Sequence, residues 1–177
     1  MNSGDITFRP AVIADALCVS ALGMQVFLTT YATQGMRPVL AREAREHFSL
    51  GKIEALVRDE SVSFILAESA GHLVGFVQVT HGARHVLVSH EPASELDRLY
   101  VHERFTGTGT GIGKALLQRA EALAASRGAA ALWLTAWVGN ARAIGFYPRQ
   151  GYMDVGATDY VFENGHYENR VYFKELS

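Results

Sequence analysis

The chain contains very little cysteine. Cys18 is the only one among 177 residues, so no disulfide can form within the chain. A lone thiol is usual in a reducing compartment, and we expect the protein to be cytoplasmic. Cys18 falls in a predicted amphipathic helix without an obvious histidine partner, which favours a buried structural thiol over a nucleophile.

The sequence also has no large excess of positive or negative charge and no long apolar run. Its net charge is −2 and its pI is about 6.4, which does not indicate a basic surface for nucleic acid. No stretch approaches the roughly 18 consecutive apolar residues of a membrane span, and no lysine or arginine run suggests a membrane patch. Residues 1–16 lack the basic and apolar regions of a signal peptide. We therefore expect neither nucleic acid nor a membrane as a partner.

What is present is the composition of a globular protein, with 49% hydrophobic and 19% charged residues. The length suits one domain over residues 1–177. Alternating and apolar segments predict strands at 6–10, 61–68, 73–80, 95–101, 130–136, 152–162 and 167–174, the last two joined by a turn at Glu163–His166. Helical patterns begin near Asp15 and cover 39–48, 51–59, 111–127 and 140–150, with a loop at 29–38. These elements predict a mixed α/β fold.

A glycine-rich segment, FTGTGTGIGKALL at residues 105–117, precedes a helical run. Glycine stands at every second position, at Gly107, Gly109, Gly111 and Gly113. A helix N-terminus has amide groups without intrahelical acceptors and a favourable dipole for anions. Glycines let a phosphate approach the backbone because no Cβ stands in the way. The segment therefore predicts a phosphate-binding loop.

Two nucleotide motifs do not fit this loop. A P-loop needs serine or threonine after the Gly-Lys pair, but Ala115 stands there, and Thr108 occupies a required glycine position. The dinucleotide fingerprint needs a glycine where Ile112 or Lys114 stands, depending on the register. Neither a nucleotide hydrolase nor a dinucleotide-binding enzyme is indicated.

Two segments together resemble a known family. The segments LDRLYVHERFTGTGTGIGKALL and NARAIGFYPRQGY are similar, in this order, to the acetyl-CoA motifs of the GNAT superfamily of N-acetyltransferases. The second matches the family pattern at Asn140, Ala143, Phe146, Tyr147 and Gly151, with Tyr152 in place of a phenylalanine. The resemblance covers nearly the whole chain. It implies a mixed central sheet of about seven strands flanked by helices, with a splayed central strand pair, and acetyl-CoA as cosubstrate.

The loop departs from the family pattern by an additional Thr-Gly pair. We expect the extra residues to bulge before Thr108, with Gly107 absorbing the kink, so that residues 108–114 keep the usual loop. The usual glutamine or arginine is replaced by Thr106 or Thr108, depending on the register. The resemblance then implies that the cofactor contacts Leu99, Tyr100, Val101, Thr108, Gly109, Thr110, Gly111, Ile112, Gly113, Lys114, Asn140, Ala143, Phe146 and Tyr147. Asn140 has the alternative role of a helix cap, and Phe146 that of a core residue.

The resemblance also implies direct acetyl transfer to an amine. Tyr147 matches the family's general acid, which protonates the departing thiolate, and backbone groups at Leu99–Val101 would stabilise the thioester oxygen. Glu95 and Asp97 alternate on one strand face and are candidates for the base, directly or through a water, although solvent-facing carboxylates are an equal alternative. His81, His85 and His90 match no standard metal spacing and are interpreted as solvated loop residues, so no metal is expected.

The acceptor amine is open at this point. Acidic residues near the C-terminus would attract a cationic amine: Asp154, Asp159, Glu163 and Glu168, with Glu91, Glu95 and Asp97 adding to them. Residues 135–162 and 27–38 also resemble the PaiA-like subgroup, which is associated with polyamine acetylation. The alternatives are a protein or peptide N-terminal acetyltransferase and a non-catalytic acyl-CoA-binding regulator. An edge strand near the C-terminus could pair two copies into a homodimer.

Overall fold

The computed structural model describes residues 5–162 and 165–177. Its strands are β1 (Ile6–Pro10), β2 (Val62–Ser69), β3 (His72–His81), β4 (Ala93–Val101), β5 (Ala131–Trp137), β6 (Met153–Phe162) and β7 (Gly165–Glu175). Its helices are α1 (Ala16–Tyr31), α2 (Pro38–Phe48), α3 (Leu50–Arg58), α4 (Ile112–Ser126) and α5 (Ala141–Arg149), with short 3-10 turns η1 (Ile13–Asp15) and η2 (Glu103–Phe105). The mixed α/β prediction is confirmed. The predicted turn at Glu163–His166 falls partly on residues 163 and 164, which lie outside the described residues.

The seven strands form one mixed sheet in the order β1-β2-β3-β4-β5-β7-β6. β4 and β5 are parallel, whereas β1 and β2, β5 and β7, and β6 and β7 pair antiparallel. The parallel register joins Ala93–Glu95 to Ala131–Trp133, and β4 then continues to Val101. A parallel register this short agrees with the splayed central pair that the family resemblance implies.

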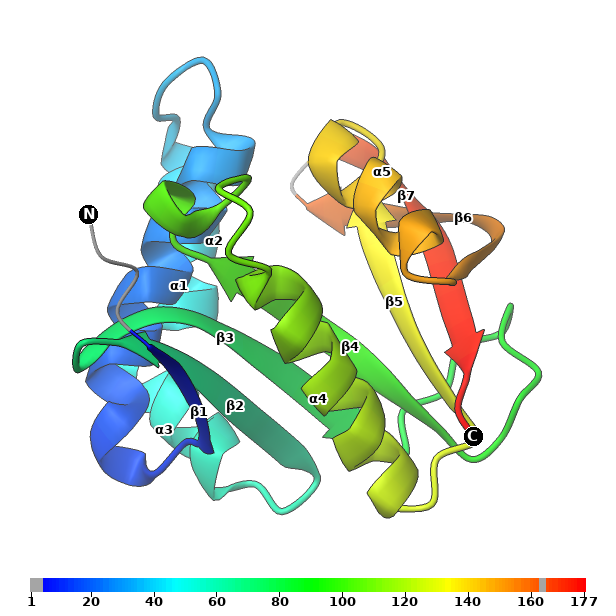
Figure 1. Cartoon of the computed structure of the whole chain (residues 1–177). Helices are drawn as coiled ribbons and strands as arrows, with labels where there is room; N and C mark the ends of the chain where they lie inside the picture. The colour runs from blue at the N-terminus through cyan, green and yellow to red at the C-terminus, as the bar shows by residue number, and fades with distance from the viewer. Residues whose placement is uncertain (1–4, 163–164) are drawn as a thin grey trace. The chain divides into compact units, whose positions relative to one another are not determined.

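The chain divides into two compact units, which are described separately. The first unit comprises Met1–Gln78 and Arg98–Ala120, and the second Val79–Asp97 and Glu121–Ser177. In the first unit, β1, β2 and β3 separate α4 from α1 and α3 (Figure 1). Its core consists of Ala16, Val19, Leu22, Phe48, Ile53, Phe64, Leu66 and Phe76. Alternate residues of β2 therefore face α1–α3, as the period of a strand requires.

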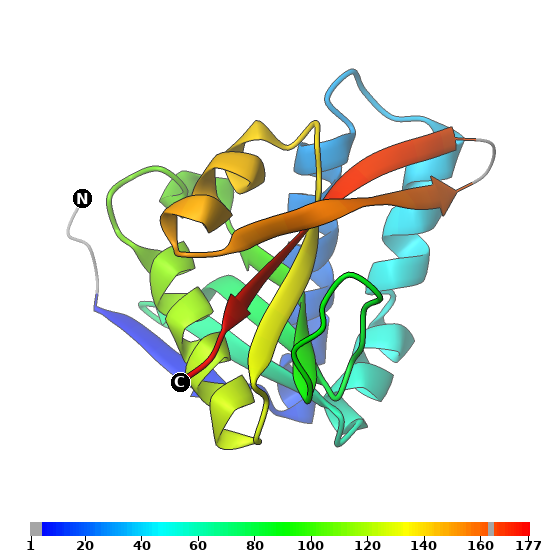
Figure 2. The same ribbon diagram turned by 90° about the vertical axis from the view of Figure 1, so that its right-hand side faces the viewer.

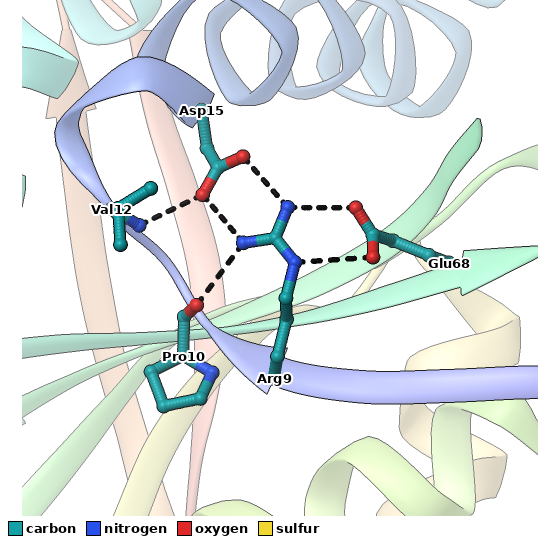
Figure 3. Close-up of polar contacts among 5 residues, drawn as sticks. All are labelled: Arg9, Pro10, Val12, Asp15 and Glu68. Atoms are coloured by element: carbon teal, nitrogen blue, oxygen red, sulfur yellow. Dashed lines mark hydrogen bonds and ion pairs between the residues drawn. The ribbon is translucent and has the colours of Figure 1, made fainter. Parts of the chain in front are cut away.

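An arginine joins the first strand to its neighbours (Figure 3). The guanidinium of Arg9 donates hydrogen bonds to both carboxylate oxygens of Asp15, at 2.7 and 2.8 Å, and to both of Glu68, at 3.1 and 2.7 Å. Asp15 also accepts the amide hydrogen of Val12 at 2.8 Å. β1, η1 and β2 are thus tied together by charge-assisted hydrogen bonds.

Helix α1 differs from the prediction in its end and in one side chain. Thr29 and Thr30, expected in a loop, are helical, and their hydroxyls donate to the carbonyls of Gln25 and Val26 at 2.9 and 2.8 Å. Cys18 is exposed, so its interpretation as a buried thiol is wrong. The helix buries the face of Ala16 and Val19, and position 18 falls outside that face.

One helical segment has the length and composition of a membrane span. Ile13–Tyr31 has a mean hydropathy of 1.5 over its most apolar window, although polar residues interrupt it. Core helices of folded domains have the same composition. Ala16, Val19 and Leu22 pack into the core of the first unit, so the apolar face of this helix is used within the chain.

The second unit contains β5, α5 and the long β6–β7 hairpin (Figure 2). Its core includes Val88, Ala93, Ala131, Trp133, Val171 and Phe173. The loop between β3 and β4 is packed, because Trp133 donates its indole N–H to the carbonyl of Ala83 at 3.0 Å. The rings of His85 and His90 lie 5.0 and 4.9 Å from those of Trp133 and Phe173. Both histidines are half-buried, so their interpretation as solvated loop residues holds only in part.

Candidate functional site

The glycine-rich loop lies in the first unit and connects η2 to α4. Gly107, Gly109 and Gly111 have φ angles of +72°, +79° and +69°, a conformation that side chains with a Cβ rarely adopt. The alternation of glycine in the sequence therefore has a backbone cause. Gly113 does not share this conformation and is already inside α4.

The loop presents amide groups at the start of α4. The amide of Ala115 donates to the carbonyl of Gly111 at 2.9 Å, so the preceding amides of Ile112, Gly113 and Lys114 have no intrahelical acceptor. The hydroxyls of Thr108 and Thr110 each donate to the carbonyl of Phe105 at 3.1 Å. These hydroxyls close the loop on itself, while the helix amides remain suited to an anion.

The end of β4 packs tightly under the same loop. A Cβ built on Gly75 of β3 would lie 2.9 Å from the carbonyl oxygen of Tyr100 and 3.2 Å from Leu116 of α4. A Cβ on Gly113 would lie 4.0 Å from Val101. Val101 and Gly113, both predicted as cofactor contacts, are therefore brought together in this unit. Sequence reasoning missed Gly75, since a lone glycine in a strand pattern does not reveal its neighbour.

The two candidate bases lie at the start of β4, in the second unit. Asp97 is exposed and accepts a hydrogen bond from the hydroxyl of Thr80 at 2.7 Å. Glu95 is half-buried and is in register with Trp133 of β5. Both carboxylates are on strand β4 and two residues apart, as predicted, and the choice between them as base stays a prediction.

An aromatic cluster with one cation occupies the other face of β4, in the first unit. The ring of Tyr100 lies 5.9 Å from that of Phe48 and 5.5 Å from that of Phe76. The guanidinium carbon of Arg98 lies 4.8 Å from the centre of the Phe48 ring. Burial raises the pKa of the Tyr100 and Tyr31 phenols. Sequence reasoning missed Arg98, because its partners are far away in the sequence.

The second motif forms helix α5 in the second unit. Asn140 caps this helix, since its side-chain oxygen accepts the amide hydrogen of Ala143 at 3.2 Å. Tyr147 is 8% exposed, and its ring lies 5.2, 5.7 and 6.2 Å from those of Phe146, Tyr152 and Tyr172. Phe146, expected to pack into the core, is only half-buried. The predicted general acid is thus held among aromatic rings.

Tyr152, which replaces the family's phenylalanine, fixes the end of α5. Its amide donates to the carbonyl of Tyr147 at 3.1 Å, and its hydroxyl donates to Glu121 of α4 at 3.1 Å. Glu121 is ion-paired with Lys174 of β7 at 3.0 Å. Burial and the Glu121 carboxylate strongly raise the pKa of the Tyr152 phenol, so this tyrosine remains neutral.

The acidic surface predicted near the C-terminus is partly neutralised. Arg170 lies 2.8 Å from Asp154 and 3.6 Å from Glu168, and Arg84 lies 3.2 Å from Glu91. The hydrogen bond from Arg170 holds the pKa of Asp154 below its usual value. Glu163 lies outside the described residues. These ion pairs weaken the attraction for a cationic acceptor that the sequence alone suggests.

Among residues 5–162 and 165–177, no group of three or more His, Cys, Asp or Glu side chains is placed to hold a metal ion.

Comparison with known proteins gives a family match and similar folds. The model of the acetyltransferase (GNAT) family matches residues 28–152. The PaiA N-acetyltransferase from Thermoplasma acidophilum in complex with coenzyme A is 20% identical, with a TM-score of 0.73 over 97% of this chain and 99% of that one. The ribosomal-protein-alanine N-acetyltransferase from Brucella melitensis is 24% identical, with a TM-score of 0.69 over 96% and 99%. The spermidine/spermine N-acetyltransferase SpeG from Vibrio cholerae, in complex with manganese ions, is 14% identical, with a TM-score of 0.64 over 96% of this chain and 92% of that one.

Proposed function

The chain belongs to the acetyltransferase (GNAT) family, and from this we propose that it transfers the acetyl group of acetyl-CoA directly to a primary amine. The family match confirms the resemblance seen in the two sequence motifs and makes the chain an acetyl-CoA-dependent acyltransferase. The single observation that carries the proposal is the loop of left-handed glycines that ends at the free amides of α4.

The loop and the end of β4 would hold the cosubstrate. Amides of residues 108–114 would bind the pyrophosphate of acetyl-CoA, since the N-terminus of α4 favours negative charge. Backbone groups of Leu99–Val101 would pair with the pantetheine arm and donate to the thioester oxygen as it gains charge. Ala143 and Phe146 of α5 would contact the pantetheine arm. Because Asn140 already caps α5, its side chain has less freedom to reach the cosubstrate.

The transfer step needs one acid and one base. The amine nitrogen attacks the thioester carbonyl carbon, the C–S bond then breaks, and the thiolate takes the phenolic proton of Tyr147. The proton lost by the amine nitrogen goes to Glu95 or Asp97, directly or through a water. Solvent returns a proton to the tyrosinate after the products leave. Tyr147 suits the acid role because a phenol is neutral and protonated at neutral pH.

We propose two classes of acceptor. Polyamines are one class, in keeping with the fold shared with a spermidine/spermine N-acetyltransferase and with the PaiA-like motifs. α-Amines of amino acids or peptides are the other, in keeping with the fold shared with a ribosomal-protein-alanine N-acetyltransferase. The ion pairs of Arg170 reduce the case for polyamines, because they neutralise part of the acidic surface.

A CoA-release assay tests the proposal. Purified protein and acetyl-CoA are mixed with spermidine, spermine, amino acids and peptide amines, and the acetylated product is identified by mass spectrometry. Turnover of any primary amine supports the proposal. Binding of acetyl-CoA without acetylation of any amine would instead identify a non-catalytic acyl-CoA-binding regulator.

The proposal also covers the cellular compartment and the oligomeric state. We propose a cytoplasmic enzyme that acts on a small-molecule amine, in keeping with the single cysteine and the near-neutral charge. β6 is one of the two edge strands in the sheet order, with β1 as the other, and could pair with a second copy into a homodimer. Light scattering after size-exclusion chromatography decides between monomer and dimer.

A further inference from the structure

Arg98 is a partly buried cation on the strand to which the proposed function assigns acetyl transfer. We infer that Arg98 binds a carboxylate of the acceptor, so that the substrate is a small amino acid, or a peptide of similar reach, and not a polyamine. This inference rests on the proposed function, since it concerns the acceptor of the same reaction. It uses only residues of the first unit.

The guanidinium of Arg98 is held in a fixed position. Its carbon lies 4.8 Å from the centre of the Phe48 ring, within the range of a cation–π contact. Its Nη1 donates a hydrogen bond to the side-chain oxygen of Gln78, which is 3% exposed and therefore immobile. A guanidinium carries five N–H donors, so further donors remain for a planar bidentate ligand such as a carboxylate.

In the part of the chain that the structure describes, no carboxylate neutralises this charge. Within residues 5–162 and 165–177, Arg98 forms no ion pair, whereas Arg9 is held by Asp15 and Glu68 together. Arg98, Tyr31 and Tyr100 are each half-buried, so water reaches this place only in part. A partly buried cation is stabilised when it meets an opposite charge. The missing charge is the one that an acceptor carboxylate would supply.

Tyr31 and Tyr100 suit the same ligand. Burial raises the pKa of both phenols, and the charge of Arg98 acts in the opposite direction on each pKa. Tyr31 ends α1 and Phe48 ends α2, so the two helix ends and β4 surround the cation. The Tyr100 hydroxyl is a phenol O–H, a group that can donate its proton to an anion.

The position along β4 sets the size of the acceptor. Arg98 precedes Leu99–Val101, whose backbone groups the proposed function places at the thioester. A strand rises about 3.3 Å per residue, so the attacking amine and the carboxylate would be separated by less than roughly 10 Å. Such a molecule is an α-amino acid or a short ω-amino acid. A polyamine would instead bring a second cation towards Arg98, which is repulsive in a partly buried place.

Matched acceptor pairs test the inference. Phenylalanine is compared with phenethylamine, and 4-aminobutyrate with propylamine, so that each pair differs only in the carboxylate; spermidine is the polyamine arm. We expect kcat/KM to be at least about tenfold higher for the carboxylated member of one pair. Equal use of both members, or spermidine as the best acceptor, would overturn the inference and leave the proposed function intact. No acetylation of any amine would overturn both.

Two variants assign the effect to Arg98. Arg98→Gln is expected to raise the KM for the carboxylated acceptor at least about tenfold, with the KM for acetyl-CoA unchanged and the decarboxylated amine little affected. Arg98→Lys keeps the charge without the planar fork and should recover part of the loss. Arg58→Gln, an arginine of the same unit with a 63% exposed side chain, is the control and should match the unmodified protein. A carboxylate preference that survives in a folded Arg98→Gln would overturn the assignment.

Discussion

The guanidinium of Arg9 lies 2.7 Å from the carboxylate of Glu68, across the pair of strands β1 and β2 (Figure 3). The same guanidinium holds Asp15 at 2.7 Å. One side chain therefore fastens the first strand to the second and to the turn that begins α1. Since α1 supplies much of the core of the first unit, this contact contributes to the stability of the unit as a whole.

We predict that Arg9→Gln lowers the free energy of unfolding by about 1 kcal/mol, because the guanidinium is partly exposed and solvent screens its ion pairs. For a chain of this size the melting temperature should fall by about 2–4 °C. Chemical and thermal denaturation followed by circular dichroism measure both values. Arg58→Gln, which loses a single exposed pair with Glu54 at 3.6 Å, is the control. Equal losses in the two variants would show that the bridge to Asp15 and Glu68 adds nothing.

The pH dependence of stability tests the same cluster. The hydrogen bond from Arg9 holds the pKa of Asp15 below its usual value. A carboxyl with a lowered folded pKa stabilises the protein above its unfolded pKa, near about 3.9, and this contribution is lost as the pH falls through the folded pKa. We predict that Asp15→Asn destabilises the protein at pH 6 and flattens the loss of stability below about pH 4. Asp5→Asn, at an exposed position nearby, should change neither. Urea titrations between pH 6 and about pH 3 measure the free energy of unfolding of each variant.

Local sequence patterns predicted most of the fold, and long-range contacts account for the errors. The glycines before α4 and the proline that begins α2 act on their own backbone, so their effects are visible in sequence. The sequence alone indicates that His85 and His90 are solvated, because their ring partners, Trp133 and Phe173, are far away in the chain. Thr29 and Thr30 are predicted as loop residues from the sequence. In the structure their hydroxyls donate hydrogen bonds to carbonyls one helical turn earlier, so both residues belong to α1.

The parts of the candidate site that lie in sequence motifs were predictable, and the parts that depend on long-range packing were not. Tyr147 and the loop belong to recognisable motifs, and their positions in α5 and before α4 follow from those motifs. Arg98 belongs to no such pattern. Its stacking on Phe48 and its hydrogen bond to Gln78 depend on how α2, β3 and β4 pack, which no periodicity reveals.

Tyr147→Phe tests the general acid. Removal of the hydroxyl should lower kcat by roughly 100-fold or more, because the thiolate then leaves without a proton. The KM for acetyl-CoA should change little, since the ring and its aromatic contacts remain. Steady-state kinetics with the best acceptor measure both. Tyr160→Phe, at a 43% exposed position on β6, is the matched control. Unchanged turnover in Tyr147→Phe would remove this residue from the mechanism.

Gly107 and Gly111 offer a matched test of the phosphate loop. Their φ angles are +72° and +69°, and a Cβ at either position meets no atom within 4 Å. Alanine should therefore cost a similar strain at both, about 1–2 kcal/mol. Only Gly111 belongs to the segment that we assign to the pyrophosphate, and a Cβ there would stand where a phosphate must approach the backbone.

We predict that Gly111→Ala weakens CoA binding about tenfold more than Gly107→Ala does, with equal losses of thermal stability. Isothermal titration with CoA measures the affinities, and dephospho-CoA serves as a second ligand that keeps the pyrophosphate. Equal stability losses would show that the difference in affinity comes from the ligand and not from a disturbed loop. The reverse order, with Gly107→Ala the weaker binder, would contradict the assignment of residues 108–114 to the pyrophosphate and of Gly107 to the bulge.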